Sequence, residues 1–123
     1  MTGMRDRRFP RRVYGVGAEP DARFSLANER TFLAWIRTSL ALLAGGVALE
    51  AFALPLHPVL RLTASIILIV SGILVPLHAW WGWMRAERAL RQNTPLPAPT
   101  IAGPLAVVVV VVGVLVLLGL VVA

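Results

Sequence analysis

Cysteine and lysine are both absent from this sequence of 123 residues. Without cysteine, the chain can form no disulfide bond and no thiolate metal site, and it has no cysteine nucleophile. Charged residues are scarce as well, at 15% of the chain against 58% for hydrophobic residues. In a soluble globular protein about a quarter of the residues are charged. The composition therefore argues against a free cytosolic enzyme.

Enzyme motifs are also missing. The sequence contains no GxSxG elbow, no HExxH metal motif and no phosphate-binding P-loop. His57 and His78 stand at opposite ends of a long apolar run, so they cannot share a metal ion. We therefore predict no enzymatic activity, no catalytic residue, no metal site and no cofactor.

Acidic residues number six against twelve arginines, which gives a formal net charge of +6. In a soluble protein this charge would favour nucleic acid as the partner. Here the arginines are segregated from long apolar runs. We therefore predict that the partners are membrane lipids, especially anionic ones, and that nucleic acid is not a partner.

Three apolar runs predict three transmembrane helices, over residues 31–54, 62–84 and 101–123. Each is long enough to cross a hydrocarbon core of about 30 Å, which needs about 20 residues of helix. The predicted fold is thus an all-α integral membrane domain over residues 21–123. The third run has no polar side chain, and we expect it to face lipid.

The arginines are distributed unequally around these runs. Ten of them precede the first run or lie between the second and the third, whereas the short connection at residues 55–58 has only Arg61 nearby. Because basic loops stay cytoplasmic, the N-terminus is predicted inside and the C-terminus outside. Residues 1–20 are predicted to be a disordered basic cytoplasmic tail, and acidic Glu19 and Asp21 argue against a cleaved leader. Glu50 is expected to pair with Arg61 or to reach the interface.

A stripe of arginines marks the first predicted helix. Asp21 is a candidate N-cap, and a helix from there carries Arg23, Arg30 and Arg37 at a spacing of seven residues. Seven residues turn a helix by about 700°, so each arginine lies only about 20° from the one before. In one interpretation the arginines anchor the helix at the interface; in the other they face a water-filled cavity or an anionic ligand.

Small residues continue the arginine face and predict self-association. They are Ala34, Ala41, Ala44 and Ala48, with Gly45 and Gly46 beside them. Small side chains allow the close backbone approach that drives helix association in lipid. One copy has too few helices to enclose a channel. We therefore predict a homo-oligomer with the first helices innermost.

Four further polar residues are candidate inter-subunit or structural sites: Asn28, Glu29, His78 and Arg85. An asparagine at this depth can form a hydrogen bond between helices. Glu29 has two interpretations. It forms a salt bridge or lies as a solvated carboxylate at the level of the lipid headgroups, or it contacts an adjacent subunit. His78 and Arg85 follow Ser71 at a spacing of seven in the second helix, which makes a polar stripe. A structural role and a relay role both remain open for this histidine.

The run from Leu26 to Trp35, LANERTFLAW, resembles the signature of a family of small three-span membrane proteins, the YidH-like domain of unknown function 202. A similar domain forms the membrane part of the eukaryotic vacuolar transporter chaperone, a polyphosphate polymerase and translocase. The resemblance covers residues 20–123 and implies a pentamer whose first-helix basic residues line a polyphosphate-conducting pore. By motif, Glu29 and Arg30 match the Asn-Glu-Arg run, and Arg23 matches the basic residue seven positions earlier.

The predicted function combines the arginine stripe with this resemblance. We expect a small oligomeric protein of the bacterial inner membrane, acting as a pore or channel that binds anions or phosphate-type polyanions through arginine rings on its first helix. The sequence carries neither the polymerase domain nor the phosphate-sensing domain of the chaperone, so polyphosphate synthesis is not expected. The alternative is a non-conducting accessory or scaffold protein whose arginines bind anionic lipid.

Overall fold

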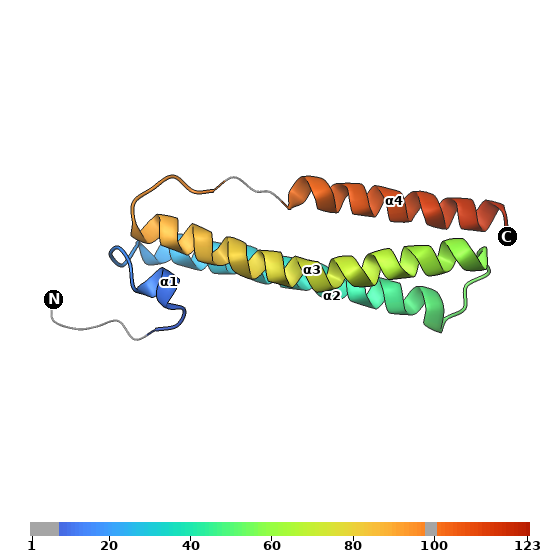
Figure 1. The fold of residues 1–123 in the computed structure, drawn as a ribbon, viewed down its shortest axis with the longest axis horizontal. Helices are drawn as coiled ribbons and strands as arrows, with labels where there is room; N and C mark the ends of the chain where they lie inside the picture. Colours follow the sequence, from blue (N-terminus) through green and yellow to red (C-terminus); the bar gives the residue numbers. More distant parts are fainter. Residues whose placement is uncertain (1–7, 98–100) are drawn as a thin grey trace. The chain divides into compact units, whose positions relative to one another are not determined.

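The regular structure of the protein is helical throughout the described residues. The computed structural model describes residues 8–97 and 101–123. It contains α1 (Arg11–Tyr14), α2 (Ala22–Ala51), α3 (Pro58–Arg91) and α4 (Ala102–Val121) (Figure 1). The helices α2, α3 and α4 are each long and apolar enough to cross a membrane. The predicted all-α fold with three candidate spans is therefore confirmed.

The helices differ in length from the apolar runs that predict them. α2 begins nine residues earlier, at Ala22, and stops at Ala51, where a turn follows with Ala53 in the left-handed region at a φ of 46°. α3 has 34 residues and is therefore about 51 Å long, which exceeds the apolar core of a bilayer. An apolar run identifies only the part of a helix that lies in the lipid. The polar turns at the ends of the helix extend beyond that run, so the helix is longer than the run.

The chain forms two compact units. The polar unit comprises residues 8–34 and 79–97, and the apolar unit comprises residues 35–78 and 101–123. Each unit contains one stretch of α2 and one stretch of α3. The polar unit also holds α1, and the apolar unit also holds α4.

Two serine–glycine pairs join α2 to α3 in the apolar unit. Ser39 Oγ donates a hydrogen bond to the Gly72 carbonyl at 2.5 Å, and Ser65 Oγ donates one to the Gly46 carbonyl at 2.6 Å. The backbones approach closely here, since a Cβ added to Gly46 would lie 2.9 Å from the Ser65 carbonyl oxygen. Small residues and hydroxyl groups thus form the helix contact, as is usual in membranes.

Pro76 explains why one of these bonds is needed. A proline within a helix has no N–H to donate to the carbonyl four residues earlier, and in α3 that carbonyl belongs to Gly72. Ser39, itself buried, supplies the missing donor from α2. A proline in a membrane helix is tolerated when a neighbouring side chain satisfies the freed backbone group in this way.

The far end of the apolar unit is held by the connection between α2 and α3. Arg61 Nε lies 3.3 Å from Glu50 Oε1, which confirms the expected pair, and Arg61 Nη1 also donates to the Leu54 carbonyl at 2.9 Å. The His57 N–H donates to the Gly119 carbonyl of α4 at 3.0 Å. Most of the valines and leucines of α4 are exposed, as a lipid-facing helix requires.

Residues 8–20 differ from the disordered tail that the sequence predicts, whereas residues 1–7 lie outside the described part of the chain. Residues 11–14 form α1, and Val13 is fully buried. The Ala18 N–H donates to the Arg91 carbonyl at 2.9 Å. The difference arises because the contacts that order this segment come from the end of α3, far away in the sequence.

Candidate functional site

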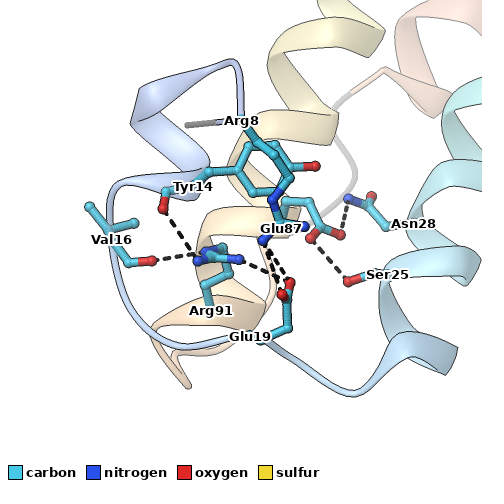
Figure 2. A network of polar contacts seen from close by, with 8 residues as sticks. All are labelled: Arg8, Tyr14, Val16, Glu19, Ser25, Asn28, Glu87 and Arg91. Atoms are coloured by element: carbon cyan, nitrogen blue, oxygen red, sulfur yellow. Dashed lines mark hydrogen bonds and ion pairs between the residues drawn. The ribbon is translucent and has the colours of Figure 1, made fainter. Parts of the chain in front are cut away.

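A buried carboxylate, Glu87 of α3, lies at the centre of the polar unit (Figure 2). Its side chain accepts a hydrogen bond from Ser25 Oγ at 3.0 Å and one from Asn28 Nδ2 at 3.3 Å. Asn28 Nδ2 also lies 3.1 Å from the Trp83 carbonyl oxygen. Glu87 is only 4% exposed, so these donors replace the water that a carboxylate needs. The three side chains hold the first turns of α2 against α3.

Arg91, one helical turn after Glu87, binds the segment before α2. Its Nε donates to the Val16 carbonyl at 2.9 Å and its Nη2 donates to the Tyr14 carbonyl at 3.3 Å. Its Nη1 lies 3.3 Å from Glu19 Oε1. A guanidinium group suits this position because its donors diverge in one plane and reach several acceptors at once. Arg91 is thus a structural residue that fixes residues 14–19.

Arg8 completes the network. Its Nη2 bonds both carboxylate oxygens of Glu19, at 3.0 and 3.1 Å, and its guanidinium carbon lies 4.3 Å from the centre of the Tyr14 ring (Figure 2). The Tyr14 ring in turn packs against Trp83, with 6.4 Å between the ring centres. The charged and aromatic groups therefore order the polar unit together.

Asp21 precedes α2 and caps its N-terminus, as the sequence predicts. Its Oδ1 accepts a hydrogen bond from the Arg23 N–H at 2.9 Å, and its Oδ2 lies 3.1 Å from Arg23 Nη2. The Arg23 guanidinium, followed by the Arg23 N–H, lowers the pKa of the Asp21 carboxyl group. The carboxylate also carries a negative charge at the positive end of the helix dipole, where it is stabilising.

The three arginines of the predicted anion site are all exposed on α2. Arg23 and Arg30 belong to the polar unit, and Arg23 is engaged by Asp21. Arg37 belongs to the apolar unit. Among the described residues, neither Arg30 nor Arg37 has a hydrogen bond or ion-pair partner. Both guanidinium groups are therefore open to a ligand or to another chain.

The small residues of α2 divide between two roles. Ala34, Ala41 and Ala44 are exposed, as the self-association hypothesis requires, and Ala48 is half-buried. Gly46 is buried against α3, where an added Cβ would lie 2.6 Å from Ile69 Cγ1. The expectation that Gly46 lies on the self-association face is therefore wrong, because its missing side chain makes room for the helix within the same chain.

The remaining candidate residues separate in the structure. Asn28 is half-buried and bonds within its own chain, whereas Glu29 and Arg85 are exposed and have no partner among the described residues. His78 is exposed.

The sequence alone did not identify Glu87 or Arg91 as site residues. Their signal is the series Trp83, Glu87 and Arg91 at a spacing of four, which places an aromatic ring and two opposite charges on one face of α3.

An open cavity of about 750 Å³ lies in the polar unit, lined by residues 17–21 and 89–94 and by Phe24. Its wall carries the carboxylates of Glu19 and Asp21, and the Arg91 guanidinium within it already has three acceptors. Such a wall does not favour an anion. Within the described ranges, no three histidine, aspartate or glutamate side chains gather as a metal site requires. The exposed arginines of α2 therefore remain the candidate site.

Comparison with known proteins assigns most of α2 and α3 to one family. Residues 23–89 match a domain of unknown function, DUF202. The chain belongs to the DUF202 family. The match begins at Arg23 and contains Arg30, Arg37 and Glu87, whereas α1, Arg91 and α4 lie outside it. The family part of the resemblance is thereby confirmed, and the chain is a membrane protein of this family.

Two relatives are identical to this DUF202 protein at about half of the aligned positions. An uncharacterized protein of Mycobacterium tuberculosis (strain H37Rv) is 49% identical over 106 residues, which cover 85% of this chain and 86% of the relative. The inner membrane protein YidH of Escherichia coli (strain K12) is 47% identical over 88 residues, which cover 70% of this chain and 76% of that protein. No solved structure matches the chain.

Proposed function

We propose that this DUF202 protein is an oligomeric pore of the inner membrane that binds phosphate-type anions through Arg30 and Arg37, with Arg23 at the mouth. The observation that carries the proposal is the exposure of Arg30 and Arg37 without a partner among the described residues. An unpaired arginine within a membrane span is costly, so it calls for water or an anion. The likeness to the inner membrane protein YidH supports the location.

The two faces of α2 support self-association. Ser39, Leu42 and Gly46 are buried, whereas Ala41 and Ala44 are exposed. In the sequence, Arg23, Arg30 and Arg37 follow one another at a spacing of seven, the period that keeps residues on one face of a helix. A second copy can approach closely along small side chains. One chain has three candidate spans, too few to enclose a channel, so a pore requires several copies around the α2 helices.

The charge of the arginines favours an anion as the species that such a pore would bind. Several copies would bring one Arg30 and one Arg37 each around a common axis, and like charges at short range repel strongly in a low dielectric. Phosphate oxygens offset this repulsion, and the planar guanidinium group binds them with two hydrogen bonds. The exposed Glu29 of a neighbouring copy would reduce the repulsion further. The resemblance to the chaperone's membrane domain points to the same class of anion.

The deciding experiment measures ion conductance of the purified protein in planar bilayers with phosphate-type anions. The parent protein should conduct with anion selectivity. The Arg30→Gln variant and the Arg37→Gln variant should each lose that selectivity. Arg11→Gln is the matched control because Arg11 is likewise an exposed arginine and lies on α1, outside the proposed anion site. Native mass spectrometry in mild detergent should find an oligomer that Ala41→Leu alters and Val109→Leu, an exposed change on α4, does not.

The same experiment distinguishes the accessory alternative. If the parent never conducts, and Arg30→Gln and Arg37→Gln change only the anionic lipid that co-purifies, the protein is a non-conducting scaffold. Monomers alone in mild detergent would also contradict the pore.

A further inference from the structure

A second group of arginines lies on the polar unit, away from α2. Arg12 of α1 and Arg85 and Arg88 of α3 are all exposed, and Trp81 of α3 is 42% exposed. The Arg12 guanidinium carbon lies 4.9 Å from the centre of the Trp81 ring. Arg88 Nη1 donates to the Arg12 carbonyl at 3.1 Å. We call these four residues the Arg12 surface.

Helix geometry brings the α3 members of the Arg12 surface together. Arg85 and Arg88 follow Trp81 by four and seven positions, which places all three side chains within about 60° on one face of α3. The fold of residues 8–20 then adds Arg12 from a position 76 residues earlier than Arg88. The Arg12 surface therefore exists only because this segment is ordered against α3.

The charge of the Arg12 surface is not neutralised within the described chain. No described carboxylate forms an ion pair with Arg12, Arg85 or Arg88. Glu87, the nearest acid in sequence, is buried and accepts its hydrogen bonds from α2. Three exposed guanidinium groups thus lie on the polar unit with no ion-pair partner among residues 8–97 and 101–123.

The aromatic component indicates which anion fits. Trp81 presents an apolar ring with a polar edge, and such rings reside at the level of lipid headgroups. Phe9, on the segment that carries Arg12, is 80% exposed and stacks on Trp80, the residue before Trp81. Free phosphate would gain nothing from exposed rings, whereas a phospholipid offers a phosphate to the arginines and acyl chains to the aromatic side chains.

We propose that the Arg12 surface is a binding site for an anionic phospholipid headgroup, with Arg12, Arg85 and Arg88 holding the phosphate and Trp81 lying at the acyl boundary. Trp81 also orients Arg12, because a guanidinium group over an indole ring is held in place by the ring's electron density. None of the four residues belongs to α2, so the site does not depend on the proposed pore.

The test measures retention of phosphatidylglycerol against phosphatidylcholine by the full chain, using native mass spectrometry of protein released from mixed-lipid nanodiscs. The parent should retain phosphatidylglycerol preferentially. Arg85→Gln and Arg88→Gln should each weaken that preference about fivefold, as removal of one arginine from an anionic surface does. Inorganic phosphate at millimolar concentration should not displace the lipid, which separates a headgroup site from a site for the free ion.

The controls make the outcome decisive. Arg85 has no hydrogen bond to another described residue, so Arg85→Gln removes charge without removing a structural contact. Arg11→Gln removes the same charge from an exposed position on α1 outside the Arg12 surface and should leave the preference unchanged. The inference is overturned if Arg85→Gln retains the parent's preference, if Arg11→Gln reduces it equally, or if phosphate displaces the lipid. Conductance plays no part in this readout, so the pore and the lipid site can fail separately.

Discussion

Ser39 and Ser65 make similar bonds for different reasons. Ser39 donates to the Gly72 carbonyl, which Pro76 has deprived of its partner within α3. Ser65 donates to the Gly46 carbonyl, and the helical residue four positions later, Glu50, has an N–H available for the same oxygen. The first hydroxyl group supplies a necessary donor, and the second adds a bond to a carbonyl that is already satisfied.

Substitution of these serines should separate the two cases. Ser39→Ala is expected to lower the free energy of unfolding by about 1–2 kcal/mol, because it leaves a buried carbonyl without a donor. Ser65→Ala, the matched control, should cost about 0.6 kcal/mol, an average value for a side-chain hydrogen bond in a membrane protein. Denaturation of the detergent-solubilised protein, followed by circular dichroism, measures both. Equal losses would contradict the role assigned to Pro76.

For single residues, the sequence predicts contacts between residues that are close together along the chain. The Asp21 cap and the Glu50–Arg61 pair join residues whose positions follow from helix ends and short loops. Glu87 could not be assigned in the same way, because a glutamate among arginines near the end of a helix resembles a solvated residue. Its burial depends on Ser25 and Asn28, which are more than fifty residues away in the sequence.

The helix α2 uses its two faces for different contacts. Periodicity predicts one face that carries the arginines and the alanines. It does not assign Gly46, because a glycine suits a contact within a chain as well as one between chains. Only the neighbouring Ile69 and Ser65 of α3 decide between these possibilities.

Alanine at the paired glycines tests the packing of α2 on α3. Gly46→Ala should destabilise the protein by about 1–3 kcal/mol, because its Cβ would meet the Ser65 carbonyl oxygen at 2.9 Å and force the helices apart. Gly45→Ala should be neutral or stabilising, since its Cβ would lie at an ordinary 3.6 Å from Leu68 Cδ1 and alanine favours the helix. The same denaturation measurement applies. A Gly46→Ala protein as stable as the parent would show that the contact is looser than described.

For the whole molecule, composition and apolar length were sufficient to predict an all-α protein with three candidate spans. Helix bounds were less accurate, because polar helical turns at the ends of α2 and α3 carry no apolar signal. Residues 8–20 could not be predicted as ordered, since glycine, proline and arginine are typical of disordered tails. Their order comes from Arg91, Trp81 and Trp83 of α3.

The arginine asymmetry predicts the orientation of the molecule in the membrane. Ten arginines lie on the side of the N-terminus and the second loop, so that side should be cytoplasmic. Alkaline phosphatase, which is active only outside the cytoplasm, should work when it is fused after Ala123 and fail when it is fused near Gln92. The reverse pattern would overturn the assigned orientation, and a cytoplasm-active reporter at the same two positions provides the control.

The hydrogen bond from Arg91 to Val16 joins residues 75 positions apart, and this separation sets an order of events during synthesis. A ribosome adds about 5–20 residues per second, so this distance takes about 4–15 s to translate. Throughout that interval residues 14–19 have emerged but their anchor does not yet exist. Residues 14–19 can therefore reach their final structure only after the end of α3 has been synthesised.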